Sequence, residues 1–215
     1  MLKVDKYKTW WYKVVDLIEK IAAGIHWQRT AAVFNNGIYY HLLEKDHDTL
    51  RATLGRRHFI ILNHRSCHFT TYVIALMTLI KSGKIGYWTH AFVNTARTKF
   101  VEATAIGTHS STFMQVFDCD GVVLLSLKGV SDDEWWEAAA DTLKDDMGKP
   151  YDDLFDYMNT ECLSCVEVVW TIIENLKDYR TRFPNLIAMI ESEKQLTPQM
   201  YYDCPDFEKI FEVRR

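Results

Sequence analysis

Glycine and proline are scarce in this chain of 215 residues, which holds nine and four copies, and no repeat or Gly/Ser-rich linker interrupts it. A collagen-like or low-complexity chain would need far more of both residues. Hydrophobic residues make up 48% and aromatic residues 13% of the sequence, which excludes a disordered chain and suffices for a large core. The length fits one domain, or one domain with a helical extension.

Long apolar segments are also missing. The longest run, about residues 72–80, is too short to span a bilayer. The start, MLKVDKYKTWWYK, interleaves charges with apolar residues and lacks the apolar region of a signal peptide. Five cysteines, an odd number in a chain that can build its own core, do not require a disulfide framework. We therefore expect a reducing compartment, the cytoplasm by default, although a protein carried in a virion or released by lysis would look the same.

Charge is unevenly spread, although the net charge is only −4. Residues 1–100 carry 15 Lys and Arg against 6 Asp and Glu, whereas residues 101–215 carry 10 against 23. The basic residues are scattered, which favours two complementary surfaces of one domain over a basic surface for an anionic partner. We expect no nucleic-acid partner, because the overall charge gives no bias toward one.

Hydrophobic periodicity predicts helices, then strands, then helices. An apolar stripe at helical spacing marks the first 45 residues: Tyr7, Trp10, Trp11, Val14, Leu17, Ile18, Ile21 and Ile25. Strands are expected over 58–63, 86–94 and 99–104, with a hairpin formed by 113–117 and 122–127. Further helices are expected over 69–81, 131–148 and 166–177, after Pro184 and from Thr197. This order predicts an α+β fold with an antiparallel sheet rather than a doubly wound fold.

Residues 164–167 (SCVE) match a helix capping box, with Ser164 as the N-cap and Glu167 as the third helical residue. Cys165 would then begin the helix, where the helix dipole and unpaired N–H groups favour the nucleophilic thiolate. The same N–H groups can serve as an oxyanion hole. The pattern is common, however, and recurs at 171–174. Spacing alone favours an inert buried cysteine, because Cys165 is in register with the apolar face of its helix.

A thiolate nucleophile needs a base, and the base needs an orienting group. His90 lies within the expected strand 86–94, between Trp88 and Phe92 on the same side, and Glu102 lies on the next strand. On antiparallel neighbours both side chains can point to one face, where the carboxylate would hold the imidazole in one tautomer. A histidine on a strand can equally be a satisfied core residue, and Glu102 a solvated carboxylate.

Cys162 and Cys165 also form a C-x-x-C pair. A zinc site would need a second ligand pair, and the available cluster is His64, Cys67 and His68. Nothing in the spacing supports that combination, so we expect no metal and no cofactor. A redox pair would normally follow a strand near the start of the fold, whereas Cys162 is better read as a spare thiol that can trap Cys165 on oxidation.

Four short blocks follow one another in a particular order. They are WTHAFV at 88–93, FVEA at 100–103 with Gly107, GKPYD at 148–152 with Phe155 and CVEVVW at 165–170, and a tail from Leu196-Thr-Pro198 through Cys204-Pro205 to Phe207. This arrangement resembles the circularly permuted papain-like hydrolases of the NlpC superfamily, in which the histidine precedes the cysteine. The resemblance covers roughly residues 50–213, and the order is more specific than any one block. It implies a permuted papain-like core with Cys165 as nucleophile, His90 as base and Glu102 as orienting residue.

The chain departs from the family pattern at three places. Val166 replaces the Ser that usually follows the cysteine. Residues 55–58 (GRRH) replace the usual Gly-Asp, which removes an acid near the site entrance and adds positive charge. Residues 1–50 are not explained by the core motif. We expect them to form a helical extension packed on a catalytic domain of residues 51–215, the alternative being an element that docks a partner.

The resemblance implies a cysteine hydrolase that cleaves an amide or isopeptide bond, as in the stem peptides of bacterial peptidoglycan, through a thioester acyl-enzyme. The superfamily also includes lipid acyl hydrolases and acyltransferases, so a lipid ester is the alternative substrate. A third alternative is a catalytically inactive papain-like module that docks through its N-terminal helix.

Overall fold

A computed structural model of the chain describes residues 42–55, 57–65, 71, 74–76, 78–79, 83, 85–96, 99–104, 106–152, 161–193 and 196–215. The expected N-terminal helix and its packing lie outside these residues, as do Cys67, His68 and Phe155. The expected helix over 69–81 is described in part, and residues 71, 74–76 and 78–79 are helical.

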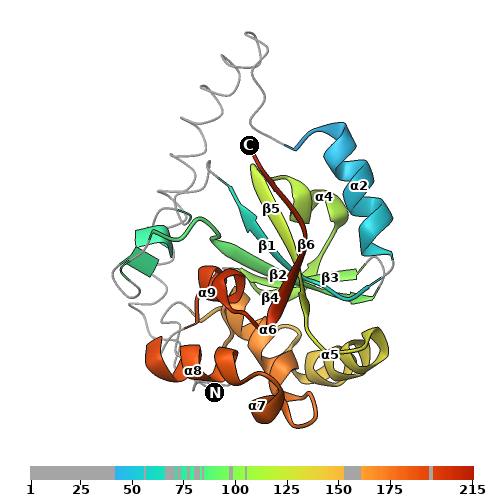
Figure 1. The fold of residues 1–215 in the computed structure, drawn as a ribbon. Helices are drawn as coiled ribbons and strands as arrows, with labels where there is room; N and C mark the ends of the chain where they lie inside the picture. The colour runs from blue at the N-terminus through green and yellow to red at the C-terminus, as the bar shows by residue number, and fades with distance from the viewer. Residues whose placement is uncertain are drawn as a thin grey trace, which may run out of the picture.

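The described chain forms an antiparallel sheet of six strands in the order β4-β3-β2-β1-β5-β6 (Figure 1). The strands are β1 Ile60–His64, β2 His90–Ala96, β3 Lys99–Thr104, β4 Gly107–Ser111, β5 Gly121–Leu127 and β6 Phe207–Arg214. Ile60 lies opposite Val93 and Asn63 opposite His90, so the end of β1 lies beside the start of β2. The predicted α+β class with an antiparallel sheet is therefore correct.

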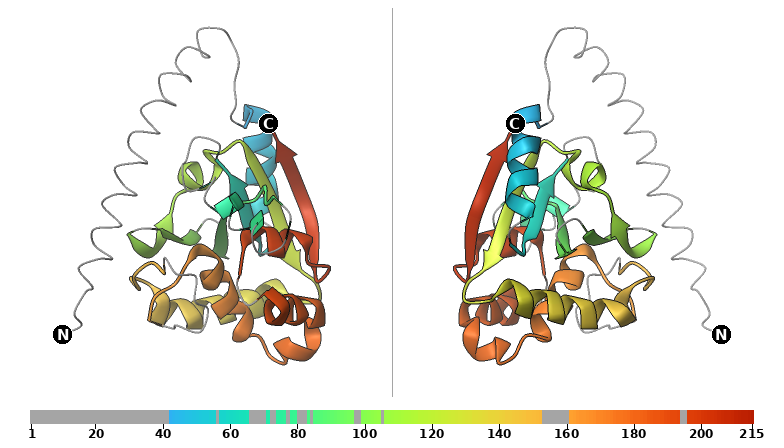
Figure 2. Two further views of the ribbon diagram at one scale, coloured as in Figure 1. Left: turned by 90° about the vertical axis from the view of Figure 1, so that its left-hand side faces the viewer. Right: turned by 90° about the vertical axis from the view of Figure 1, so that its right-hand side faces the viewer.

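Helices cover both faces of the sheet (Figures 1 and 2). One face carries α2 Glu44–Leu54 and α4 Phe113–Phe117, and the other carries α5 Asp132–Asp146, α6 Cys165–Glu174, α7 Tyr179–Arg182, α8 Pro184–Glu193 and α9 Pro198–Asp203. Successive residues of a strand point to opposite faces of the sheet. Val93 therefore packs toward α5 and α6, and Phe92 packs toward α2 and α4. No described helix has the length and apolar character needed to cross a membrane.

Helix α2 crosses the expected boundary between residues 50 and 51. Leu50 and Leu54 are both buried in the core cluster that contains Phe59 and Ile61 of the sheet layer. The packing of α2 is therefore continuous across that boundary.

The predicted hairpin of 113–117 with 122–127 is wrong, because residues 113–117 form helix α4. Thr112 and Gln115 make a capping box, in which Thr112 N–H donates to Gln115 Oε1 at 2.8 Å and Gln115 N–H donates to Thr112 Oγ1 at 3.4 Å. The rings of Phe113 and Phe117, four residues apart, have their centroids 4.6 Å apart. The helix takes the place of the strand expected over 113–117, and β5 pairs with β1 and β6 rather than with that segment.

The strand expected over 86–94 begins only at His90. Trp88 packs in the layer of α5 and α6, opposite to Phe92, so the predicted common face for Trp88, His90 and Phe92 is also wrong. The backbone N–H groups of Tyr87 and Trp88 donate to Gln199 Oε1 of α9, at 2.9 and 3.3 Å, rather than to a neighbouring strand. A distant side chain therefore decides where β2 starts.

Strands β4 and β6 are not predicted from the sequence. β4 has the sequence GTHSS, with little β-branched or aromatic content, and β6 is an edge strand whose residues after Phe207 are largely or partly exposed. Thr108 of β4 makes two backbone hydrogen bonds with the 148–149 loop, each 2.9 Å long. Its N–H donates to the carbonyl oxygen of Lys149, and its own carbonyl oxygen accepts from the N–H of Gly148. The helices after 131, 164, Pro184 and Thr197 form as expected.

Gly107 opens β4 with φ of 94°, and an added Cβ would lie 2.5 Å from the carbonyl oxygen of Lys149. Gly129 also has positive φ, 73°, but an added Cβ would meet nothing within 4 Å. We predict that both Gly→Ala variants lose about 1–2 kcal/mol of unfolding free energy from backbone strain. Gly107→Ala should lose roughly 1–3 kcal/mol more, because the 148–149 backbone must move. Denaturant unfolding measures the difference, and equal losses would contradict the close packing.

Candidate active site

Cys165 is the first residue of α6, as the capping pattern predicts, and is only 1% exposed. The backbone N–H of Ser164 donates to Glu167 Oε2 at 2.5 Å, so the Glu167 side chain closes the first turn. Eight residues of α6 are buried, which fits a helix that is apolar almost all round and packs on β2 and β3. The thiol is therefore held at a helix N-terminus within the core.

His90 begins β2 and Glu102 lies within β3. His90 Nε2 is 2.6 Å from Glu102 Oε2, with side-chain exposures of 18% and 6%. The carboxylate accepts the Nε2 proton, which fixes the tautomer and leaves Nδ1 for a second partner. The imidazole is also hydrogen-bonded to the Cys165 thiol, and it rests edge-on against Phe92 with centroids 4.5 Å apart. The structure therefore brings together the three side chains singled out from the sequence.

The electrostatics of the site favour a charged imidazole. Burial alone lowers the pKa of His90, but the charge and hydrogen bond of Cys165, followed by those of Glu102, outweigh burial and raise the pKa to about 9. Burial likewise raises the pKa of Glu102, yet His90, then Ser111 and then the charge of Arg65, hold that pKa below its ordinary value. At neutral pH the pair is an imidazolium and a carboxylate.

Ser111 and His109 also contact Glu102, and the sequence did not indicate them. Ser111 Oγ donates to Glu102 Oε1, and His109 Nε2 lies 3.6 Å from the same oxygen. Both residues belong to β4. Had that strand been recognised, the alternation of 109 and 111 would have placed both side chains on the face of the Glu102 carboxylate.

Arg57 and His58 of the basic segment lie away from the site, which corrects the expectation that these two residues add charge at the entrance. His58 Nδ1 is 2.8 Å from Asp132 Oδ1, and the Arg57 carbonyl accepts from Asn94 Nδ2 at 3.0 Å. Both precede β1, whereas His90 faces the other end of that strand. The cation whose charge reaches Glu102 is instead Arg65, which follows β1.

Cys162, Cys165 and His64 belong to the C-x-x-C pair and the histidine cluster that were weighed above as metal ligands. Both cysteines are buried, and neither forms a disulfide. His64 Nδ1 lies 2.7 Å from the carbonyl oxygen of Tyr87. Across the parts of the chain that the structure describes, no group of three or more His, Cys, Asp and Glu side chains is placed to hold a metal ion.

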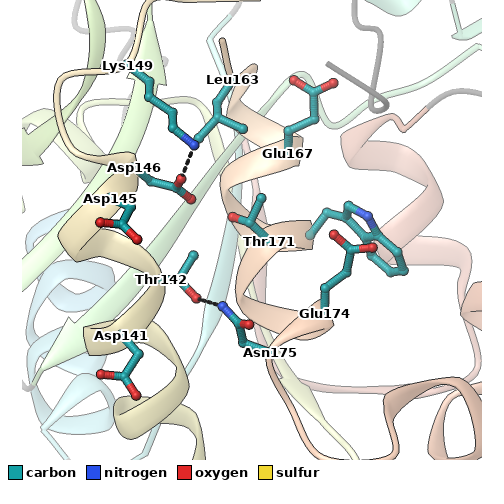
Figure 3. Close-up of a pocket in the computed structure, with 11 residues that line it drawn as sticks. Asp141, Thr142, Asp145, Asp146, Lys149, Leu163, Glu167, Thr171, Glu174 and Asn175 are labelled. Atoms are coloured by element: carbon teal, nitrogen blue, oxygen red, sulfur yellow. Dashed lines mark hydrogen bonds and ion pairs between the residues drawn. The ribbon is translucent and has the colours of Figure 1, made fainter. Parts of the chain in front are cut away.

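A separate hollow of about 460 Å³ lies between α5 and α6 (Figure 3). Acidic residues dominate its lining: Asp141, Asp145, Asp146, Glu167 and Glu174. Lys149 Nζ binds Asp146 Oδ1 at 2.5 Å, and Asn175 Nδ2 donates to Thr142 Oγ1 at 2.5 Å. None of Cys165, His90 and Glu102 lines the hollow, so this recess does not coincide with the cysteine site.

Comparison with known proteins gives one structural likeness. No family model matches the chain, and no curated protein gives a significant match. A crystal structure of the metalloprotein yiiX from Escherichia coli O157:H7, DUF1105, superposes with a TM-score of 0.54 and 17% identity. The match covers 75% of this chain and 99% of that one. The likeness shows the fold alone.

Thiol reactivity tests the site without a substrate. Burial raises the pKa values of Cys119 and Cys204 to about 12, so both should resist alkylation at neutral pH. Cys165, paired with an imidazolium at a helix N-terminus, should react with iodoacetamide at least tenfold faster, as measured by peptide mass spectrometry at pH 7. His90→Ala should remove the difference. A Cys165 no faster than Cys119 and Cys204 in the unmodified protein would contradict the charged pair.

Proposed function

We propose that the chain is a cysteine hydrolase with a circularly permuted papain-like fold. The observation that supports it is the His90 ring, which contacts both the Cys165 thiol and the Glu102 carboxylate. A nucleophile, a base and an orienting group in contact are what thiol-dependent acyl transfer requires. The order of the histidine strand before the cysteine helix agrees with the permuted family that the sequence resembles.

In the proposed reaction, the Cys165 sulfur attacks the substrate carbonyl carbon and His90 carries the thiol proton. His90 gives this proton to the leaving amine as the tetrahedral intermediate breaks down, which leaves a thioester on Cys165. A water molecule then attacks the thioester, His90 takes its proton, and the proton returns to the sulfur as the acid leaves. Glu102 keeps the ring oriented and stabilises its positive charge.

The negative oxygen of each tetrahedral intermediate needs hydrogen-bond donors close to Cys165. The first N–H groups of a helix have no partners within that helix, and they point toward its N-terminus together with the positive end of the dipole. The N–H groups of the first turn of α6 are suited to this role, because Cys165 is itself the first residue of that turn.

The proposed bond is an amide or isopeptide of a peptide, with bacterial cell-wall fragments as the first class to test. This choice rests on the family resemblance. A lipid ester is the alternative substrate, because the same thioester chemistry accepts either acyl group. Mass analysis of the acyl group trapped on Cys165 distinguishes a peptidyl from a fatty acyl adduct.

The structural neighbour is titled a metalloprotein. Within the described residues of this chain no metal-ligand cluster of three side chains is present.

Mutant kinetics test whether the side chains act as one unit. Cys165→Ala and His90→Ala should each abolish hydrolysis of a cell-wall peptide library, and the double variant should be little worse than either single variant. Glu102→Gln should lose less, because it disturbs orientation without removing a reacting group. Independent, additive losses for Cys165 and His90 would contradict a shared mechanism.

A further inference from the structure

The two oxygens of the Glu102 carboxylate have different partners. Oε2 faces His90, whereas Oε1 faces β4. In the β3–β4 register Glu102 lies opposite His109, and Phe100 lies opposite Ser111. Ser111 Oγ donates to Oε1, and His109 Nε2 lies 3.6 Å from it. A third strand therefore holds the carboxylate from the side away from the imidazole.

We propose that Ser111 is a positioning residue of the cysteine site, which acts by fixing the Glu102 carboxylate against His90. This inference rests on the proposed function and assigns to β4 a part in tuning that site. Ser111 touches none of the reacting atoms, so its effect passes through Glu102 and His90 to Cys165.

The physical argument begins with the freedom of a glutamate side chain. Its terminal torsion is broad, so one hydrogen bond does not fix the plane of the carboxylate. A second bond to Oε1 removes that freedom and keeps Oε2 at 2.6 Å from His90 Nε2. Glu102 is 5% exposed, so few water molecules can replace a lost donor. A buried carboxylate without its donors is less stable as an anion.

The consequence for Cys165 has a definite sign. Weaker ionisation or poorer alignment of Glu102 stabilises the His90 imidazolium less. The imidazolium in turn stabilises negative charge on the Cys165 sulfur less, so the sulfur becomes a weaker nucleophile. Among the residues that the structure describes, the charged and titratable groups that face Glu102 are His90 from β2, His109 from β4 and Arg65 after β1, and none of them is altered by a substitution at position 111.

The neighbouring serine provides a matched control. Ser110 precedes Ser111 on the same strand but is exposed, whereas Ser111 is 7% exposed. Successive strand residues point to opposite faces, so Ser110→Ala removes a hydroxyl from β4 without touching Glu102. Thr and Val at position 111 provide an isosteric pair that differs in the hydroxyl alone.

The experiment measures alkylation of Cys165 by iodoacetamide between pH 5 and 10 in the full chain, together with thermal unfolding of each variant. At pH 6 Ser111→Ala should be alkylated roughly tenfold more slowly than the unmodified protein, because the buried Glu102 carboxylate loses a hydrogen bond to its charged form. The pH at which the alkylation rate of this variant rises should be higher than in the unmodified protein. Ser111→Thr should retain the original profile, Ser111→Val should behave like the alanine variant, and Ser110→Ala should have no effect.

Two negative results have different meanings. If Cys165 of the unmodified protein reacts no faster than Cys119 and Cys204, the proposed function fails, and the positioning role fails with it. If Cys165 reacts rapidly and the Ala and Val variants keep the original profile, Ser111 is not a positioning residue, although the proposed function stands. Should Ser111→Ala fail to fold, the Thr and Val pair decides: equal profiles overturn the inference.

Discussion

The partly buried ion pair of His90 with Glu102 is the interaction on which the arrangement of this protein depends. Removing two charges from water is costly, and their attraction offsets that cost only when the remaining hydrogen-bonding positions are also filled. Glu102 meets this condition with His90 on one oxygen and Ser111 on the other. The imidazole also interacts with the Cys165 thiol. Each member of the group therefore stabilises the charged form of the next.

The fold supplies these positions from rigid elements. Antiparallel β2 and β3 carry the base and its carboxylate, and α6 carries the nucleophile on its first turn, where the backbone favours negative charge. Tyr201 of α9 donates to the carbonyl oxygen of Val166 at 2.9 Å and so ties α6 to the C-terminal part of the chain. Gly107 lets β4 approach the 148–149 loop closely enough to bond with it. Helices and strands thus carry the three side chains of the site.

Sequence reasoning could find the residues whose role depends on local pattern. A capping box places Cys165 at a helix start, and strand alternation places His90 and Glu102 within reach of each other. It could not find what depends on pairing between distant segments. β4 is too polar to resemble a strand, so Ser111 and His109 were missed, and the competing cap at Thr112 turned an expected strand into α4. The register of β1 likewise decides that Arg57 lies at the end of the sheet away from His90.

The most direct test of the charged cysteine site is a titration of the His90 ring by NMR, with the signal assigned through His90→Gln. In the unmodified protein the ring should lose its proton with a pKa of about 9. In Cys165→Ala the pKa should fall well below that value, because the contribution of the sulfur is gone while burial, which lowers the pKa, remains. A ring that titrates near its ordinary value of 6.5 in both proteins would contradict the account.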